Sequence, residues 1–352
     1  MGGMKKKMIL IAAAALLTGA TATAVASTNE ADPIETMVAE DEATAALLYD
    51  GRHHGAGIAD LSTQRPADPR GHFRIGSATK SFVATVVLQL VDEKKLRLDD
   101  PIDEHLPGTV PNGDDITVRQ LLNHTSGLYD YMSEPGYSTN RWRGEDRFDS
   151  YRPSQLLDVA FAHDPHFEPG TDWRYSNTNY IVAGLLIERV TSNSYADEIE
   201  SRILKPLRLR HTSLPGTDPS IPEPHAHGYT EVDGETVDAT EQDPSLDWAA
   251  GEMISTTRDL TRYFSALLDG DLTSDASLKA MRDTVETGTF FEYGLGLQRF
   301  DLPCGEAMYG HSGQLLGYTT YASAEATLSY TPGAKTPSQQ RLTEVFADAY
   351  CD

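Results

Sequence analysis

A helix that is apolar on nearly every side follows Gly76 and constrains the fold more than any other stretch of the chain. Residues 77–95 read SATKSFVATVVLQLVDEKK, and between positions 82 and 91 only Thr85 and Gln89 interrupt the small or apolar residues. A helix on a surface keeps one polar face, so a helix that lacks such a face belongs in the interior. We therefore expect this segment to be buried.

Strand patterns lie at both ends of the chain, with helical patterns between them. Residues 44–49, 56–61 and 72–75 predict strands, and so do residues 293–302, 307–309 and 317–322. Helices are predicted at 118–123, 154–162, 178–191, 195–203, 257–268 and 337–350. The expected fold class is α/β (α+β), with one antiparallel sheet built from both chain ends, flanking helices, and an inserted, mainly helical region at roughly 93–290. A cleft is expected where sheet and insertion meet.

The first residues predict a secretory signal peptide. Lys5, Lys6 and Lys7 precede the apolar run 8–17, and Ala24-Val25-Ala26 provides a small-residue cleavage site. We expect residues 1–26 to be removed near Ala26, and residues 27–352 to form one secreted catalytic domain. No later stretch is apolar for long enough to span a membrane.

Composition restricts the partners. The 352-residue chain has a formal net charge of −24, so nucleic acid and anionic membranes would repel it. The histidine pairs His163/His166 and His225/His227 lack the helical spacing and glutamate of a zinc protease, and we interpret them as loop residues. We expect no metal, no cofactor and a monomer.

Two cysteines, Cys304 and Cys351, lie near the C-terminus. In an exported protein they predict one disulfide bond, which would tie the last helix to the preceding sheet.

The pair Ser77 and Lys80 carries the first chemical signal. Ser77-Ala78-Thr79-Lys80 is the only Ser-x-x-Lys in the chain, and the spacing places both side chains on one face at the start of the buried helix. Burial and the helix dipole both disfavour the charged ammonium, so Lys80 can act as a base toward the Ser77 hydroxyl. Alternatively, Ser77 only caps the helix while Lys80 extends to solvent.

Two further motifs extend this signal. Tyr175-Ser176-Asn177 precedes the apolar helix 178–191; a tyrosine there can relay a proton, and an asparagine can bind a substrate amide. His311-Ser312-Gly313 lies on or beside a predicted strand, where glycine lets a substrate approach the backbone closely. Each motif alone is also compatible with a loop junction or a strand end.

Together, in this order, the three motifs resemble those of the penicillin-recognising serine enzymes. The segments GSATKSF, TVRQLLNHTSGLYDY, YSNTNY, AGEMISTT and YGHSGQLLGYTTYA are most similar to the exported D-alanyl-D-alanine carboxypeptidases of Streptomyces. Class C β-lactamases and some esterases share the first two elements. The two cysteines fall where that carboxypeptidase has its disulfide.

The resemblance implies a role for each matching residue. Ser77 would be the acylated nucleophile, Lys80 its base, Tyr175 the proton relay, and His311 a further catalytic donor. Substrate would be bound by five residues: Ser176, Asn177, Ser312, Gly313 and, in the loop after GLYDYM, Thr139. The backbone N–H of Ser77 and one from residues 319–320 would form the oxyanion hole.

Two departures from the family pattern bear on specificity. Within LQRFDL, Gln298 stands where the carboxypeptidase has the first of two arginines, and the remaining Arg299 would face the opposite side of a strand. In addition, the final hairpin after YASAEATLSYTPGAKT looks shortened, which suggests a trimmed edge strand next to the active-site strand.

The implied function is a secreted serine-type D-Ala-D-Ala carboxypeptidase, with transpeptidation as a second fate of the acyl-enzyme. Its partners would be peptidoglycan peptides ending in D-Ala-D-Ala and β-lactam antibiotics. The alternatives are a class C-like β-lactamase or small-ester hydrolase on the same scaffold, and a non-catalytic binder of peptidoglycan or penicillin. A mere binder would need neither a base at Lys80 nor a relay at Tyr175.

Overall fold

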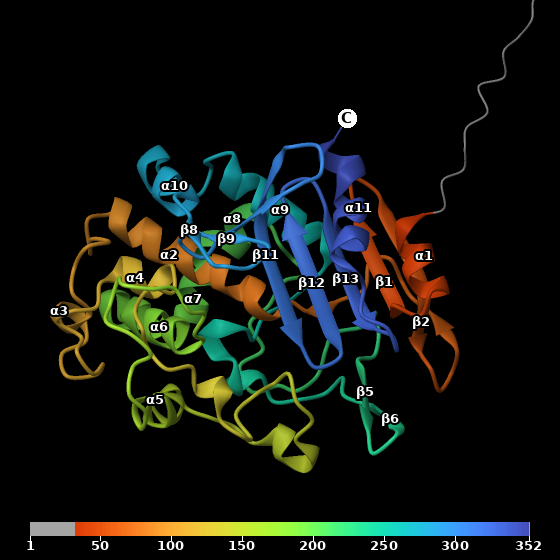
Figure 1. Ribbon diagram of the computed structural model, residues 1–352, viewed down its shortest axis with the longest axis horizontal. Coiled ribbons are helices and arrows are strands. Elements are labelled where there is room, and N and C mark those ends of the chain that lie inside the picture. Colours follow the sequence, from red (N-terminus) through yellow and green to blue (C-terminus); the bar gives the residue numbers. More distant parts are fainter. Residues whose placement is uncertain (1–31, 352) are drawn as a thin grey trace, which may run out of the picture. The chain divides into compact units, whose positions relative to one another are not determined.

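The computed structural model describes residues 32–351, so the expected signal peptide at 1–26 lies outside the described residues. Within them, a large antiparallel sheet is assembled from both chain ends, as the strand patterns predict (Figure 1). The strand order across this sheet is β3 (Arg65–Pro66), β2 (His53–Asp60), β1 (Ala43–Tyr49), β13 (Thr327–Pro332), β12 (Tyr318–Ser323), β11 (Ala307–Leu315), β10 (Gln298–Asp301), β9 (Glu292–Tyr293) and β8 (Val285–Glu286).

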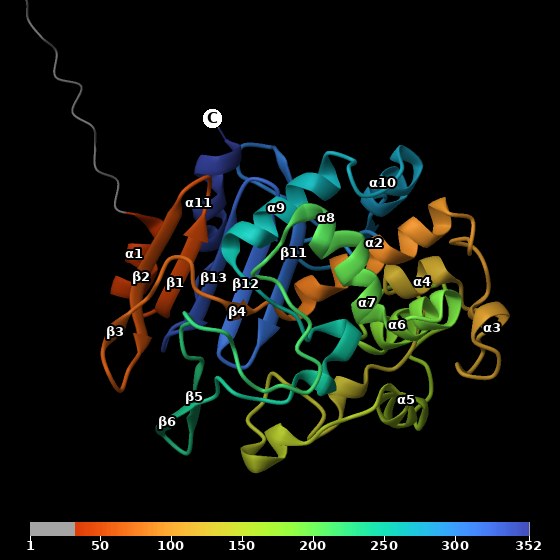
Figure 2. The same ribbon diagram turned by 180° about the vertical axis from the view of Figure 1, so that it is seen from behind.

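Helices cover both faces of the sheet. On one face, α1 (Pro33–Ala39) and α11 (Gln339–Tyr350) contact each other and enclose a small core that includes Ile34, Met37 and Phe346. On the other face, α9 (Thr257–Leu268) packs on β1, β12 and β13. Figures 1 and 2 show α11 and α9 on opposite sides of the strands.

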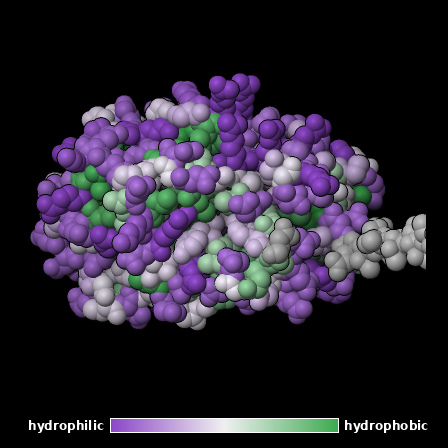
Figure 3. Space-filling view, turned by 90° about the horizontal axis from the view of Figure 1, so that it is seen from above, coloured by the Kyte–Doolittle hydropathy of each residue, from purple (hydrophilic) through white to green (hydrophobic). Residues whose placement is uncertain are grey.

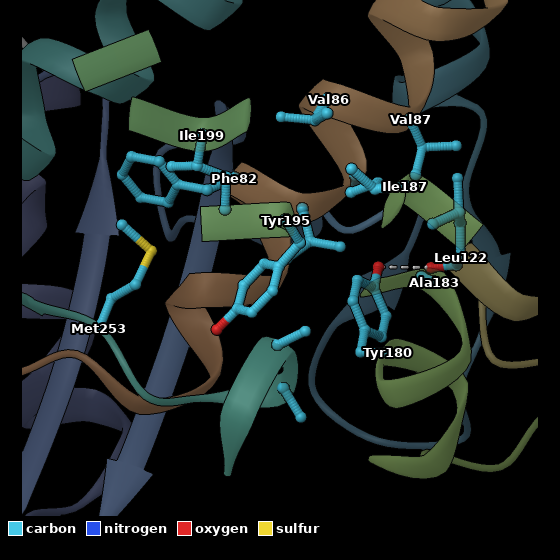
Figure 4. Packing of buried hydrophobic residues seen from close by; sticks show 14 of the residues in the cluster. Phe82, Val86, Val87, Leu122, Tyr180, Ala183, Ile187, Tyr195, Ile199 and Met253 are labelled. Atoms are coloured by element: carbon cyan, nitrogen blue, oxygen red, sulfur yellow. Dashed lines mark hydrogen bonds between the residues drawn. The ribbon is translucent and has the colours of Figure 1, made fainter. Parts of the chain in front are cut away.

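The insertion is mainly helical, as expected, and its helices pack on the apolar helix that precedes it in the chain. That helix is α2 (Thr79–Asp92), and all its residues from Thr79 to Leu88 are buried. Figure 4 shows Phe82, Val86 and Val87 of α2 among side chains of neighbouring helices. The other helices of this region are α3 (Ile102–His105), α4 (Val118–Leu122), α5 (Pro153–Phe161), α6 (Thr178–Thr191), α7 (Tyr195–Ile199), α8 (Lys205–Leu207) and α10 (Asp275–Arg282).

Several expected elements differ in extent. The strand predicted at 293–302 is divided into β9 and β10, because the backbone between them leaves the sheet to contact α2. There the Ser81 hydroxyl donates to the Gly296 carbonyl at 2.6 Å. Gly296 has φ +69, and a Cβ there would lie 2.5 Å from that of Ala84, so only glycine fits. The helix predicted at 195–203 changes to a π-helical turn at Glu200–Leu204.

The prediction of a trimmed edge strand near the active-site strand is wrong. Residues 327–332 form β13, which pairs with both β12 and β1 in the interior of the sheet. Small hydroxyl residues alternate along this strand, so its sequence lacks an apolar run. The strand is nevertheless buried along almost its whole length. The strand predicted at 72–75 shrinks to β4 (Phe73–Arg74), which pairs with β7 (Ile254–Ser255) outside the large sheet. A further hairpin is formed by β5 (Tyr229–Val232) and β6 (Glu235–Asp238).

The disulfide prediction is confirmed. Cys304 and Cys351 are bonded, with Cα atoms 5.8 Å apart, and they join the β10–β11 turn to the end of α11. Within residues 32–351, no helix combines the length and the hydrophobicity required to cross a bilayer. Hydrophilic residues cover most of the face in Figure 3, with separate apolar patches between them.

Candidate active site

Ser77 lies where strand β11 presses against the start of α2. It belongs to the 3₁₀ turn η1 (Gly76–Ala78), and Gly76 has φ +51. A Cβ at Gly76 would lie 2.8 Å from the Gln314 nitrogen, and one at Gly313 would lie 1.8 Å from the Ile75 carbonyl oxygen. The two glycines therefore allow the backbone of β11 to approach the nucleophile turn directly.

The same contact brings a different N–H group to the Ser77 turn from the one expected at residues 319–320. The backbone N–H of Gln314 adjoins the Gly76-Ser77 turn, whereas residues 319–320 belong to β12, the next strand across the sheet. Sequence reasoning missed Gln314, although it directly follows His311-Ser312-Gly313.

Lys80 is fully buried and points back toward Ser77. Its Nζ donates to Ser77 Oγ at 3.1 Å, to Asn177 Oδ1 at 2.8 Å and to the Ala250 carbonyl at 2.6 Å. Burial lowers the pKa of Lys80 to about 7, although the carboxylates of Asp130 and Asp247 raise it in part. The side chain does not extend to solvent, so the alternative of a capping serine with an outward lysine is wrong.

Asn177 links Lys80 to an acid that sequence reasoning did not single out. Its Nδ2 donates to both carboxylate oxygens of Asp130, at 3.1 and 3.3 Å, and its backbone N–H donates to Oδ1 at 3.1 Å. Burial raises the pKa of Asp130, while its hydrogen bonds and Lys80 oppose the rise. The available signal was the segment GLYDY, which contains Asp130.

The Tyr175 ring lies beside the lysine. Lys80 Nζ is 4.9 Å from its ring centroid, and the buried, neutral imidazole of His124 packs on the same ring at 4.2 Å between centroids. Burial raises the pKa of Tyr175, an effect that the neighbouring Ser77 hydroxyl moderates. The Tyr175 hydroxyl lies beside Ser77 and has no other hydrogen-bond partner among the described residues. It is thus free to bind a substrate atom.

These groups border a cleft of about 450 Å³. Six of the nine predicted site residues line it: Ser77, Tyr175, Asn177, Thr139, Ser312 and Gly313. Lys80 lies just beneath, in contact with Ser77. The cleft is also lined by Asp130, Arg141, Asp247, Phe291, Gln298 and Gln314, among others.

Ser176 and His311 do not line the cleft. The Ser176 hydroxyl is turned to the Tyr129 carbonyl, at 3.3 Å. His311 Nδ1 donates to the Ser312 carbonyl at 2.5 Å, and Nε2 accepts from the Tyr293 hydroxyl at 2.8 Å. Burial lowers the pKa of His311 to about 3, so the ring is neutral and both nitrogens are occupied. The expectation that these two side chains touch substrate is therefore corrected: they hold the motif backbone in place.

Thr139 borders the cleft through a buried pair. Its hydroxyl donates to Asp247 Oδ1 at 2.9 Å, and burial raises the pKa of Asp247 to about 6. The Thr139 side chain is only 1% exposed, so its contribution to the cleft wall is mainly to position Asp247.

Arg299 faces away from the cleft, as the strand alternation predicts. Its guanidinium pairs with Glu292 at 2.9 Å and with Asp301 at 2.7 Å. Gln298 faces the cleft instead, and its Oε1 accepts from the Ser312 N–H at 2.6 Å. The position next to Ser312 therefore carries a neutral amide rather than a cation.

Within residues 32–351, one acidic group elsewhere has metal-ligand spacing: Asp100, Glu104 and His105 place ligand atoms within 4.8 Å of one another. Asp100 already pairs with Arg97 and His105, so ion pairing accounts for the cluster.

Comparisons with known proteins agree with this geometry. The beta-lactamase family model matches residues 34–327. Penicillin-binding protein 4* of Bacillus subtilis is 31% identical over 306 residues, which are 81% of this chain but 65% of that protein; the chain thus spans just under two thirds of that relative.

Solved structures are similar over nearly the whole chain. A D-stereospecific amidohydrolase from Streptomyces sp. has a TM-score of 0.81 at 37% identity, covering 91% of this chain and 97% of that one. The D-amino acid amidase from Ochrobactrum anthropi SV3, complexed with L-phenylalanine, has a TM-score of 0.78 at 28% identity, covering 90% and 96%. The family match includes the Ser-x-x-Lys, Tyr-x-Asn and His-Ser-Gly motifs, and the chain therefore belongs to the beta-lactamase family of serine hydrolases.

Proposed function

We propose that this enzyme hydrolyses amide bonds next to D-configured residues through an acyl-enzyme on Ser77. Lys80, with its pKa near 7, takes the hydroxyl proton as Ser77 Oγ bonds to the carbonyl carbon. The N–H groups of Ser77 and Gln314 stabilise the resulting oxyanion. The C–N bond then breaks, and the proton from Lys80 passes through the Tyr175 hydroxyl to the leaving amine. Water reverses these steps to release the acid and free Ser77.

The observation that carries the choice of substrate is the neutral amide of Gln298 beside Ser312, with Arg299 held in ion pairs outside the cleft. A terminal carboxylate would need a cation there. An amide or a peptide without a free carboxylate at the leaving side needs none. The Streptomyces amidohydrolase and the Ochrobactrum amidase, both named for D-stereospecific amide substrates, support this substrate class.

The second candidate is the secreted D-Ala-D-Ala carboxypeptidase, which would act on peptidoglycan peptides and be acylated by β-lactams. Arg141 favours it: this exposed cation lines the cleft, and its guanidinium forms no ion pair with a described residue. The disulfide and the penicillin-binding relative support export and β-lactam binding.

One substrate panel tests these alternatives. The purified enzyme is given D-phenylalanine amide, its L enantiomer, a peptide ending in D-Ala-D-Ala, and a chromogenic cephalosporin, with Ser77→Ala as the control. We expect the D-amide to be hydrolysed about 100-fold faster than the L-amide, and mass spectrometry after penicillin treatment to show an adduct on Ser77.

Other outcomes assign other functions. Turnover of the D-Ala-D-Ala peptide without the amide would establish the carboxypeptidase, and rapid cephalosporin hydrolysis would establish a β-lactamase. Full biological activity of Ser77→Ala would establish a non-catalytic binder.

A further inference from the structure

A second hollow, of about 610 Å³, adjoins the catalytic cleft. Asn140 and Gln314 line both spaces, so the two lie next to each other at the carboxyl end of β11. The hollow runs between the sheet and the β5–β6 hairpin, which projects below the strands in Figure 2. Apart from Gln314, its lining residues have no role in the mechanism proposed above.

The outer wall of this hollow is fixed in place. A Cβ at Gly317, in the β11–β12 turn, would lie 2.6 Å from Gly228 Cα, so two glycines meet back to back where the hairpin leaves the sheet. The Tyr229 hydroxyl accepts from the Leu61 N–H at 2.9 Å, which ties the hairpin to the end of β2. The hollow is thus bounded by two anchored elements.

Its position identifies the part of a substrate that would enter it. Lys80 and Tyr175, which deliver the proton to the leaving amine in the proposed mechanism, lie together beside Ser77 and Asn177. None of these residues lines the second hollow. A chain that leaves the cleft past Gln314 therefore belongs to the acyl side of the scissile bond.

The lining combines an apolar floor with an acidic rim. Leu61, which is 38% exposed, lies there with Val38, Ile58, Leu315 and Leu316. The only charged lining residues are acidic: Asp41 and Glu231, which form no ion pair with a described residue. The nearby Lys335 donates its Nζ to the Glu40 carbonyl at 2.9 Å.

Building on the proposed function, we propose that the hollow binds the N-terminal part of a peptide substrate, with an apolar side chain on the floor and a cationic one at Asp41 and Glu231. The enzyme then prefers peptides extended on the acyl side over single amino acid amides. Burying one apolar side chain raises kcat/KM about 10-fold or more, and an exposed ion pair contributes about threefold.

The test compares D-phenylalanine amide with the N-acetylated tripeptide amides Lys-Leu-D-Phe and Glu-Leu-D-Phe. The lysine peptide is expected to have the highest kcat/KM and the single amide the lowest. Glu231→Gln should reduce the lysine-over-glutamate preference about threefold, and Leu61→Arg should remove most of the gain from extension. Glu235→Gln is the matched control, since Glu235 lies on the same hairpin outside the hollow.

The inference is overturned if extension brings no gain, or if the two glutamate substitutions have equal effects. Failure of the proposed function would look different, because no amide would be hydrolysed. In that event, calorimetry of the tripeptides binding to Ser77→Ala decides: tighter binding of the lysine peptide that Glu231→Gln weakens supports the site, and equal binding of both peptides refutes it.

Discussion

Arg74 and Lys80 are two basic residues buried on one short segment, but their surroundings give them different protonation behaviour. The guanidinium of Arg74 donates to the carbonyls of Pro219, Thr240 and Gln242 at 2.5–3.4 Å, and it stays charged although burial lowers its pKa. Lys80 is equally buried, but its amine loses its proton near neutral pH. Buried Arg74 therefore remains a permanent charge that stabilises the fold, whereas buried Lys80 becomes a base that titrates near neutral pH.

The largest expected effect comes from exchanging the two head groups. Lys80→Arg keeps a cation next to Ser77 but cannot give up a proton, so kcat/KM for the amide should fall about 10³-fold or more. Thermal unfolding should still show a cooperative transition, which separates lost chemistry from lost folding. Substantial activity in this variant would show that Lys80 is not the base.

Removing the structural cation should act on stability instead. Arg74→Met leaves the three carbonyls without their donor, and we expect the free energy of unfolding to fall by about 3 kcal/mol. Urea unfolding measures the loss. Activity per folded molecule should remain near that of the wild type, and a selective loss of kcat would show that Arg74 also serves the cleft.

A pH comparison sharpens the difference. The pKa of Lys80 in the folded state is lowered to about 7 from 10.5, so between these values the unfolded chain binds more protons and stability rises with pH. Relative to Lys80→Met, the wild type should gain up to about 1.4 kcal/mol per pH unit above pH 7. The amide-hydrolysis rate should rise through the same pKa. Arg74→Met should leave both profiles unchanged.

The smallest expected effect is on the pKa of Lys80. Asp130 raises the lysine pKa through its charge, so Asp130→Asn should move the acid limb of the rate profile to lower pH by less than about one unit. A shift to higher pH would contradict this assignment. Glu134→Gln, which changes a nearby carboxylate that is bonded to Tyr129 instead, is the control.

The sequence predicts those parts of the site that depend on local spacing. Ser77 and Lys80 share a helix face, and the all-round apolar pattern indicates burial, so the amino-acid pattern by itself predicts a basic lysine. Asn177 follows from its place at the start of α6. Alternation along a strand also predicts that Arg299 faces away from the cleft.

The remaining parts depend on tertiary contacts that local patterns do not encode. The partner of Asn177 is Asp130, which reaches it from a distant loop, and Gln314 acquires its role only because two glycines let β11 touch the nucleophile turn. The side chains of His311 and Ser176 are of types that often bind substrate. In the fold, however, His311 is bonded to the Tyr293 hydroxyl and Ser176 to the Tyr129 carbonyl. Likewise, the sequence pattern does not reveal β13, because its hydroxyl residues form buried hydrogen bonds to α9 and to β1.

The position of β13 has a consequence for biosynthesis. It pairs with β1, which lies far away in the chain: Ala45 and Thr331, whose N–H and hydroxyl are bonded, are 286 positions apart. β1 leaves the ribosome or a translocation channel long before β13. Until β13 follows, the edge of β1 that will pair with it has no partner strand. The sheet is completed, and the cleft given its final shape, only after residues 327–332 have emerged.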